Sequence, residues 1–122
     1  MKFTIEEPLF ESKIRVYYNE PPDEFVKAAR ITLEDDSIEF FDKADCHGKC
    51  LIRGDWRTYY LWLDKAKKQK KIDIMSYLTH ELCHIGTSFM ESVGHEASVT
   101  SELLPYFVDY YFKEICRKIW KT

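Results

Sequence analysis

The alternation of hydrophobic and polar residues along the chain predicts a set of short β-strands. They share β-branched and aromatic residues and are bounded by turn-forming residues. The predicted strands are residues 13–18, 37–41, 50–53 and 58–63. Gly54 and Asp55 lie between the last two strands and favour a hairpin, while the polar residues 42–49 favour a turn or loop. These patterns predict a small, mostly antiparallel sheet.

Apolar residues that recur every three to four positions predict three helices. The helices are expected over residues 23–33, from Asp73 to Gly94, and over residues 101–118. Asp73 suits the N-cap of the second helix and Gly94 suits its C-terminal cap. Gly86 inside that helix costs up to about 1 kcal/mol relative to alanine, and close packing would explain its presence. Pro105 is expected near the start of the last helix, where proline is tolerated.

Chain length and composition are those of one folded domain. The chain has 122 residues, of which 45% are hydrophobic and 16% aromatic, and this suits a single domain over residues 1–122 with its own core. The order of strands and helices predicts the α+β class. In that fold the sheet packs against the second helix and the C-terminal helix.

The charge balance excludes some classes of partner. The net charge is −3 and the pI is about 5.8, so no general attraction to nucleic acid is expected. Residues 65–71 contain five lysines without interleaved aromatic residues, which indicates a solvated connection and not a nucleic-acid site.

No apolar run approaches the ~20 residues of a membrane span, so no membrane partner is expected. The first eight residues lack the apolar region of a signal peptide, which predicts a cytoplasmic protein.

Four cysteines are present and are expected to remain thiols in such a compartment. Cys46 and Cys50 have no second Cys or His pair nearby to close a tetrahedral metal site, so we interpret their segment as a turn. Cys83 lies off the centre of the helix face that carries His80 and His84, and it is expected to be a packed or partly exposed thiol.

The second predicted helix contains the sequence His80-Glu81-Leu82-Cys83-His84. Residues four apart lie about 40° apart around a helix, so the two imidazoles project from one face toward one point. Two such imidazoles are two-thirds of the usual protein ligand set of a catalytic zinc ion. Glu81 lies one step around the helix, where its carboxylate can accept a proton from a water molecule without binding the metal. The pattern therefore predicts a metal site, and zinc is the expected metal.

Three downstream residues compete for the role of third ligand. Glu102 is expected to open the last helix, which folds back on the second helix after the turn at Gly94. His95 and Glu96 follow that turn directly. Ligand type alone permits all three residues.

Residues 79–84 together with residues 102–110 resemble a known group of proteins. The order HExxH, turn, and Glu at the start of a second helix is similar to the gluzincin branch of zinc metallopeptidases. More closely, it resembles the small HExxH proteins encoded by tailed bacteriophages and prophages, over roughly residues 58–115. Their last helix usually carries alanine where this chain has Pro105.

This resemblance implies a minimal zincin-like domain with zinc bound by His80, His84 and Glu102. It also implies that Glu81 is the general base, that the substrate is a peptide or protein, and that the protein acts in the cytoplasm of a bacterial host. His95 as third ligand would instead resemble the SprT-like metallopeptidases. Residues 58–63 precede the motif helix, where such peptidases place the sheet edge that pairs with substrate; the alternative is an ordinary core strand.

Two further residues of the last helix have open roles. Tyr106 is the best candidate for a hydrogen bond to a developing oxyanion, and the alternative is packing between helices. Asp109 either orients a ligand histidine or is an ordinary surface acid.

Two functions are compatible with these residues. The first is a zinc peptidase. The second is a non-catalytic phage accessory protein whose zinc site supports the fold or binds a partner. Glu81 favours the zinc peptidase, because a structural zinc site has no need of an acid beside its ligands. The sequence also shows no evident fourth protein ligand, which favours a zinc ion with an open position for water.

Overall fold

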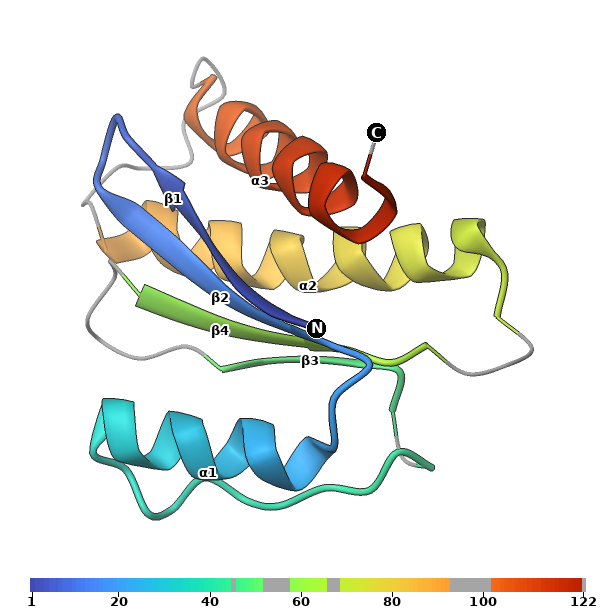
Figure 1. Ribbon diagram of the computed structural model, residues 1–122. Coiled ribbons are helices and arrows are strands. Elements are labelled where there is room, and N and C mark those ends of the chain that lie inside the picture. Colours follow the sequence, from blue (N-terminus) through green and yellow to red (C-terminus); the bar gives the residue numbers. More distant parts are fainter. Residues whose placement is uncertain (45, 52–57, 66–68, 93–101, 122) are drawn as a thin grey trace.

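The computed structural model describes residues 1–44, 46–51, 58–65, 69–92 and 102–121. These residues form a sheet with helices on both faces (Figure 1). In chain order the elements are β1 (Lys2–Glu7), β2 (Ser12–Tyr18), α1 (Pro22–Leu33), β3 (Gly48–Leu51), β4 (Thr58–Leu63), α2 (Lys71–Ser92) and α3 (Leu103–Trp120). The strand order is β1-β2-β4-β3, in which β2 and β4 are parallel and the other two pairs are antiparallel. The predicted α+β class is confirmed, and the sheet is mixed because its central pair, β2 and β4, is parallel.

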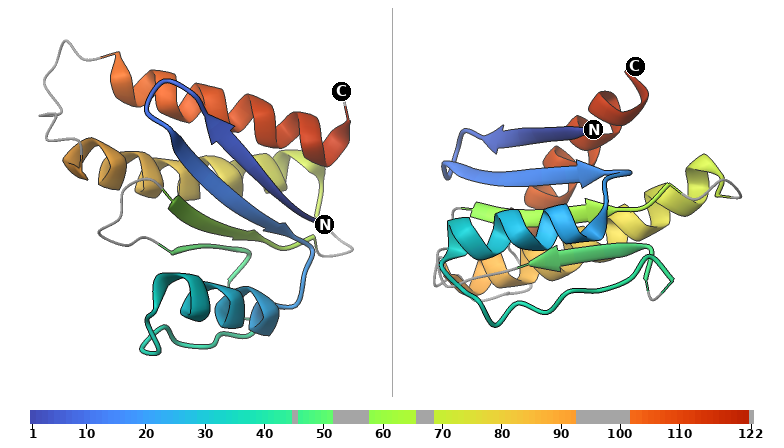
Figure 2. Two further views of the ribbon diagram at one scale, coloured as in Figure 1. Left: turned by 60° about the vertical axis from the view of Figure 1, so that its left-hand side comes forward. Right: turned by 60° about the horizontal axis from the view of Figure 1, so that its bottom comes forward.

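The sheet separates two layers of helix. Tyr59 and Leu61 of β4 face the core formed with α2 and α3, whereas Tyr60 and Trp62 face the smaller core formed with α1. Figure 2 shows α1 on one side of the sheet and the α2–α3 pair on the other. Because β4 is covered on both faces and paired on both edges, its sequence is almost continuously apolar. Of the two alternatives that the sequence left open for residues 58–63, the structure has the core strand, because both edges of β4 are paired.

Two strand predictions need correction. Residues 37–41 form no strand, because the segment passes over α1: the Arg30 side chain donates a hydrogen bond to the Ile38 carbonyl, 2.8 Å from Nε. Phe41 then packs edge-on against Trp62, with ring centroids 5.0 Å apart. Strand β1 was not predicted, although Phe3 and Ile5 alternate with polar residues, and it pairs along its whole length with β2.

Helices α2 and α3 pack unusually closely around Gly86. A Cβ atom at this position would lie 2.6 Å from Leu104 Cδ1 and 3.4 Å from Val108 Cγ2. The expected packing reason for the glycine is thus confirmed. Contact at this distance fixes the flank of α2 on which α3 lies, and with it the position of Glu102 at the start of α3.

The ends of these helices differ slightly from the predicted ones. Helix α2 begins at Lys71, two residues before the predicted cap, and Asp73 Oδ2 instead accepts a hydrogen bond from the Lys70 N–H at 2.9 Å. Helix α3 begins at Leu103, with Pro105 in its first turn. The Gly54–Asp55 turn, Gly94 and Ser101 lie outside the described residues. None of the helices in the described ranges is both long and apolar enough to cross a membrane.

Candidate metal-binding site

The structure brings the imidazole rings of His80 and His84 together on the exposed side of α2. Their Nε2 atoms are 3.2 Å apart, and the ring planes are inclined by 80°. Two ligands held about 2.1 Å from a zinc ion at the tetrahedral angle are about 3.4 Å apart. The observed separation therefore fits two nitrogens that share one metal ion.

Glu81 lies between α2 and the sheet edge. Only 8% of the residue is exposed, in contrast to its two histidine neighbours. A Cβ atom at Gly48 of β3 would be 3.3 Å from Glu81 Cγ, so only a glycine lets the strand lie this close without displacing the carboxylate. Burial, together with a hydrogen bond to Glu81, raises the pKa of the Cys50 thiol. This keeps the thiol protonated as a donor to the carboxylate.

A cavity of about 300 Å³ lies at this junction of β3 and α2. Its lining residues are His47, Gly48, Tyr77, His80 and Glu81. Strand β3 is at the edge of the described sheet, with β4 as its one neighbour there. The cavity thus combines the metal-ligand candidate His80, the carboxylate of Glu81 and a free strand edge.

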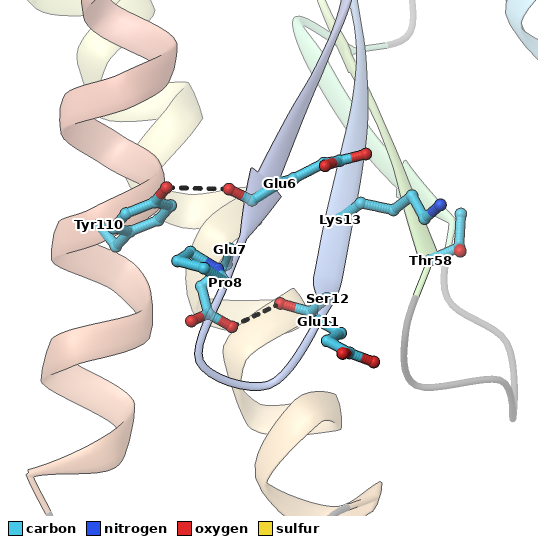
Figure 3. Close-up of a pocket in the computed structure, with 8 residues that line it drawn as sticks. All are labelled: Glu6, Glu7, Pro8, Glu11, Ser12, Lys13, Thr58 and Tyr110. Carbon is cyan, nitrogen blue, oxygen red and sulfur yellow. Dashed lines mark hydrogen bonds between the residues drawn. The ribbon is translucent and has the colours of Figure 1, made fainter.

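A larger cavity of about 630 Å³ lies elsewhere, beside the β1–β2 hairpin and α3 (Figure 3). Glu7 is fully buried there, and its carboxylate accepts hydrogen bonds from the backbone N–H groups of Leu9 and Phe10 and from the hydroxyls of Ser12 and Tyr106. These donors occupy the acceptor sites of the carboxylate, so Glu7 holds the hairpin against α3. We therefore regard the smaller cavity as the site, because His80 and Glu81 line it and His84 Nε2 lies 3.2 Å from His80 Nε2.

Tyr106 does not line the cavity of His80 and Glu81. Its hydroxyl donates a hydrogen bond to Glu7 Oε1 at 2.8 Å. Burial and the neighbouring Glu7 carboxylate raise the pKa of Tyr106 to about 12, so the hydroxyl keeps its proton for this bond. In this arrangement Tyr106 fits the packing alternative and not the predicted contact with an oxyanion.

Glu102 is not grouped with His80 and His84. In the described parts of the chain, no three His, Cys, Asp or Glu side chains are close enough to hold a metal ion. Helix geometry explains this, since Gly86, where α3 packs, is about 120–160° around α2 from the two imidazoles. Glu102 is the exposed N-cap of α3 on that other flank.

The other candidate ligands, His95 and Glu96, lie outside the described residues. Asp109 is exposed and forms an ion pair with Lys113 at 3.2 Å, which matches the interpretation as a surface acid.

His47 was not considered from sequence beyond its place in a turn. Its position directly before Gly48 is the signal that could have found it, because a glycine at the start of a strand marks close approach of another element.

Comparison of the chain with models of protein families, with curated proteins and with solved structures found no match.

Proposed function

We propose that this protein binds a zinc ion through His80 and His84 and hydrolyses peptide bonds, with Glu81 as the proton acceptor. One observation carries the proposal. The two exposed imidazole nitrogens are 3.2 Å apart, directly beside a buried carboxylate and an edge strand. Zinc, when bound, acts as a Lewis acid and lowers the pKa of water from about 16 to about 7.

Glu81 supplies the proton transfer in this proposal. Its carboxylate takes a proton from the attacking water as the new carbon–oxygen bond forms, and delivers it to the amine nitrogen as the carbon–nitrogen bond breaks. Glu81 is buried and its side chain lies against Gly48, which limits the freedom of the carboxylate to turn away from the cavity. A carboxylate held in one position avoids the entropic cost of finding its orientation.

Strand β3 supplies the docking edge for the peptide. An edge strand has N–H and C=O groups that can pair with an extended peptide. Its first residue, Gly48, lines the same cavity as His80 and Glu81. A peptide added alongside β3 would therefore pass next to both side chains.

The third zinc ligand is part of the same proposal. Glu102, His95 and Glu96 remain the candidates, and Glu102 requires the start of α3 to approach the histidine pair more closely than in this structure. The absence of a third donor within the described residues also favours a second candidate function. In that case the histidine pair completes its ligand set with a partner protein and catalyses nothing.

The test is cleavage of β-casein, an unfolded protein, by the purified zinc-loaded chain. We expect new peptide termini by mass spectrometry, loss of cleavage after the zinc is removed with a chelator, and recovery when zinc is returned. A protein that holds zinc but leaves β-casein and a broad peptide library intact would favour the non-catalytic function.

A further inference from the structure

His47 is held in place by three different contacts, although about half of its side chain is exposed. Its carbonyl oxygen accepts a hydrogen bond from the Asp64 N–H at 2.9 Å. Its ring stacks on Tyr77, with centroids 5.1 Å apart and planes inclined by 23°. Its Nδ1 atom is 2.9 Å from Gln69 Nε2. These contacts limit the orientations that the ring can adopt, and such preorganisation is what a side chain that contacts a ligand needs.

The ring nitrogens of His47 have different environments. The Gln69 amide nitrogen can only donate, so Nδ1 accepts and the hydrogen of the neutral ring is on Nε2. The buried carboxylate of Asp64 also faces Nδ1, but its Oδ2 is 3.9 Å away and beyond hydrogen-bond distance, so the closer Gln69 contact determines the tautomer of the neutral ring. The described part of the chain offers Nε2 no partner. Nε2–H is therefore the donor that remains for another molecule.

The cavity gives this donor a place to act. His47 and Tyr77 form one part of its wall, while His80 and Glu81 form another. Its volume of about 300 Å³ is at the lower end of the range of ligand pockets, which is enough for a peptide group. A carbonyl oxygen bound there would be bordered by residues of both walls.

We propose that His47 is a catalytic residue of this site, whose Nε2–H donates a hydrogen bond to the carbonyl oxygen of the peptide bond that is attacked. The inference rests on the proposed peptidase function. As the carbonyl carbon is attacked, its oxygen gains negative charge and the hydrogen bond strengthens. This is the role that the sequence suggested for Tyr106, whose hydroxyl is occupied by Glu7.

The experiment compares wild type with His47→Ala and His47→Gln. For His47→Ala we expect kcat on β-casein to fall about 10²-fold, because one donor to a developing oxyanion is lost. KM should change by less than about threefold, since the bond strengthens mainly in the transition state. His47→Gln keeps an N–H donor and should recover part of kcat. Zinc content of all three proteins should be equal, and all three should remain folded at the assay temperature, although His47→Ala loses the contacts with Tyr77 and Gln69.

A second readout is independent of turnover. In zinc-loaded Glu81→Gln protein, the Nε2 resonance of His47 is followed by ¹⁵N NMR while β-casein is added. We expect this resonance to shift, because its N–H gains an acceptor, and the same spectra report whether neutral His47 carries its hydrogen on Nε2.

The outcomes separate this inference from the proposed function. If wild type cleaves β-casein but His47→Ala has an unchanged kcat, or if the resonance does not move, the inference is wrong and the peptidase proposal stands. If wild type does not cleave β-casein, the peptidase proposal fails and only the Nε2 resonance tests the role of His47. A shift of this resonance then supports contact between His47 and the peptide, and an unchanged resonance overturns the inference.

Discussion

Replacement of Glu81 with glutamine should leave a folded, zinc-containing protein that cleaves β-casein about 10²–10⁴ times more slowly than wild type. Glutamine has nearly the same shape and can still accept the hydrogen bond from Cys50, so the packing against Gly48 is retained. Its amide cannot accept a proton from water, so the proton transfer is lost. Zinc content and cleavage should be measured on the same samples.

The matched control is Glu91→Gln on the same helix, because Glu91 is exposed in the last turn of α2. This variant should cleave β-casein as wild type does. If Glu81→Gln retains the wild-type rate, Glu81 has no role in the mechanism. If Glu91→Gln loses as much activity as Glu81→Gln, the loss reflects damage to the helix and not to the chemistry.

Glu7→Ala should lower the free energy of unfolding by about 3–5 kcal/mol. Glu7 is fully buried, and its carboxylate accepts hydrogen bonds from two backbone N–H groups and two hydroxyls. One of these hydroxyls, that of Tyr106, belongs to α3. Alanine removes the acceptor of these donors, most of which are partly buried, and a buried donor without an acceptor costs about 1–3 kcal/mol. The Ser12 hydroxyl, which also contacts the Tyr111 hydroxyl, and relaxation of the hairpin recover part of the sum. Denaturant unfolding of the purified variant measures the change.

The neighbouring Glu6 provides the control for this prediction. Its side chain is exposed, and its carbonyl oxygen, which alanine retains, accepts a hydrogen bond from the Tyr110 hydroxyl at 2.8 Å. Glu6→Ala should change stability by less than about 0.5 kcal/mol. A loss of under about 1 kcal/mol for Glu7→Ala would mean that the hairpin does not depend on this carboxylate to dock on α3.

Much of the fold could be predicted because periodicity and burial agree within single elements. The alternation in β2 and the apolar spacing in α1 and α2 correspond directly to the faces that they bury. The spacing of His80 and His84 needed only helix geometry to bring two ring nitrogens together. In each case the determining interaction is local in sequence.

The features that could not be predicted depend on contacts between distant residues. The apolar run of β4 is compatible with a central strand, but which strand forms the sheet edge depends on the pairing of β4 with β2, and that pairing joins residues distant in sequence. The hydroxyl of Tyr106 has a partner, Glu7, that is 99 residues away in sequence. The flank of α2 on which α3 packs is set by Gly86, and that flank determines how far Glu102 lies from the histidine pair.

Zinc content is the measurement that tests the central proposal most directly. Wild type and His80→Ala are loaded with zinc, freed of excess metal by gel filtration and analysed for metal by mass spectrometry. We expect about one zinc ion per chain in wild type and essentially none in His80→Ala, because a single imidazole cannot replace the pair. Wild-type protein without zinc, or His80→Ala with as much zinc as wild type, would contradict the proposal.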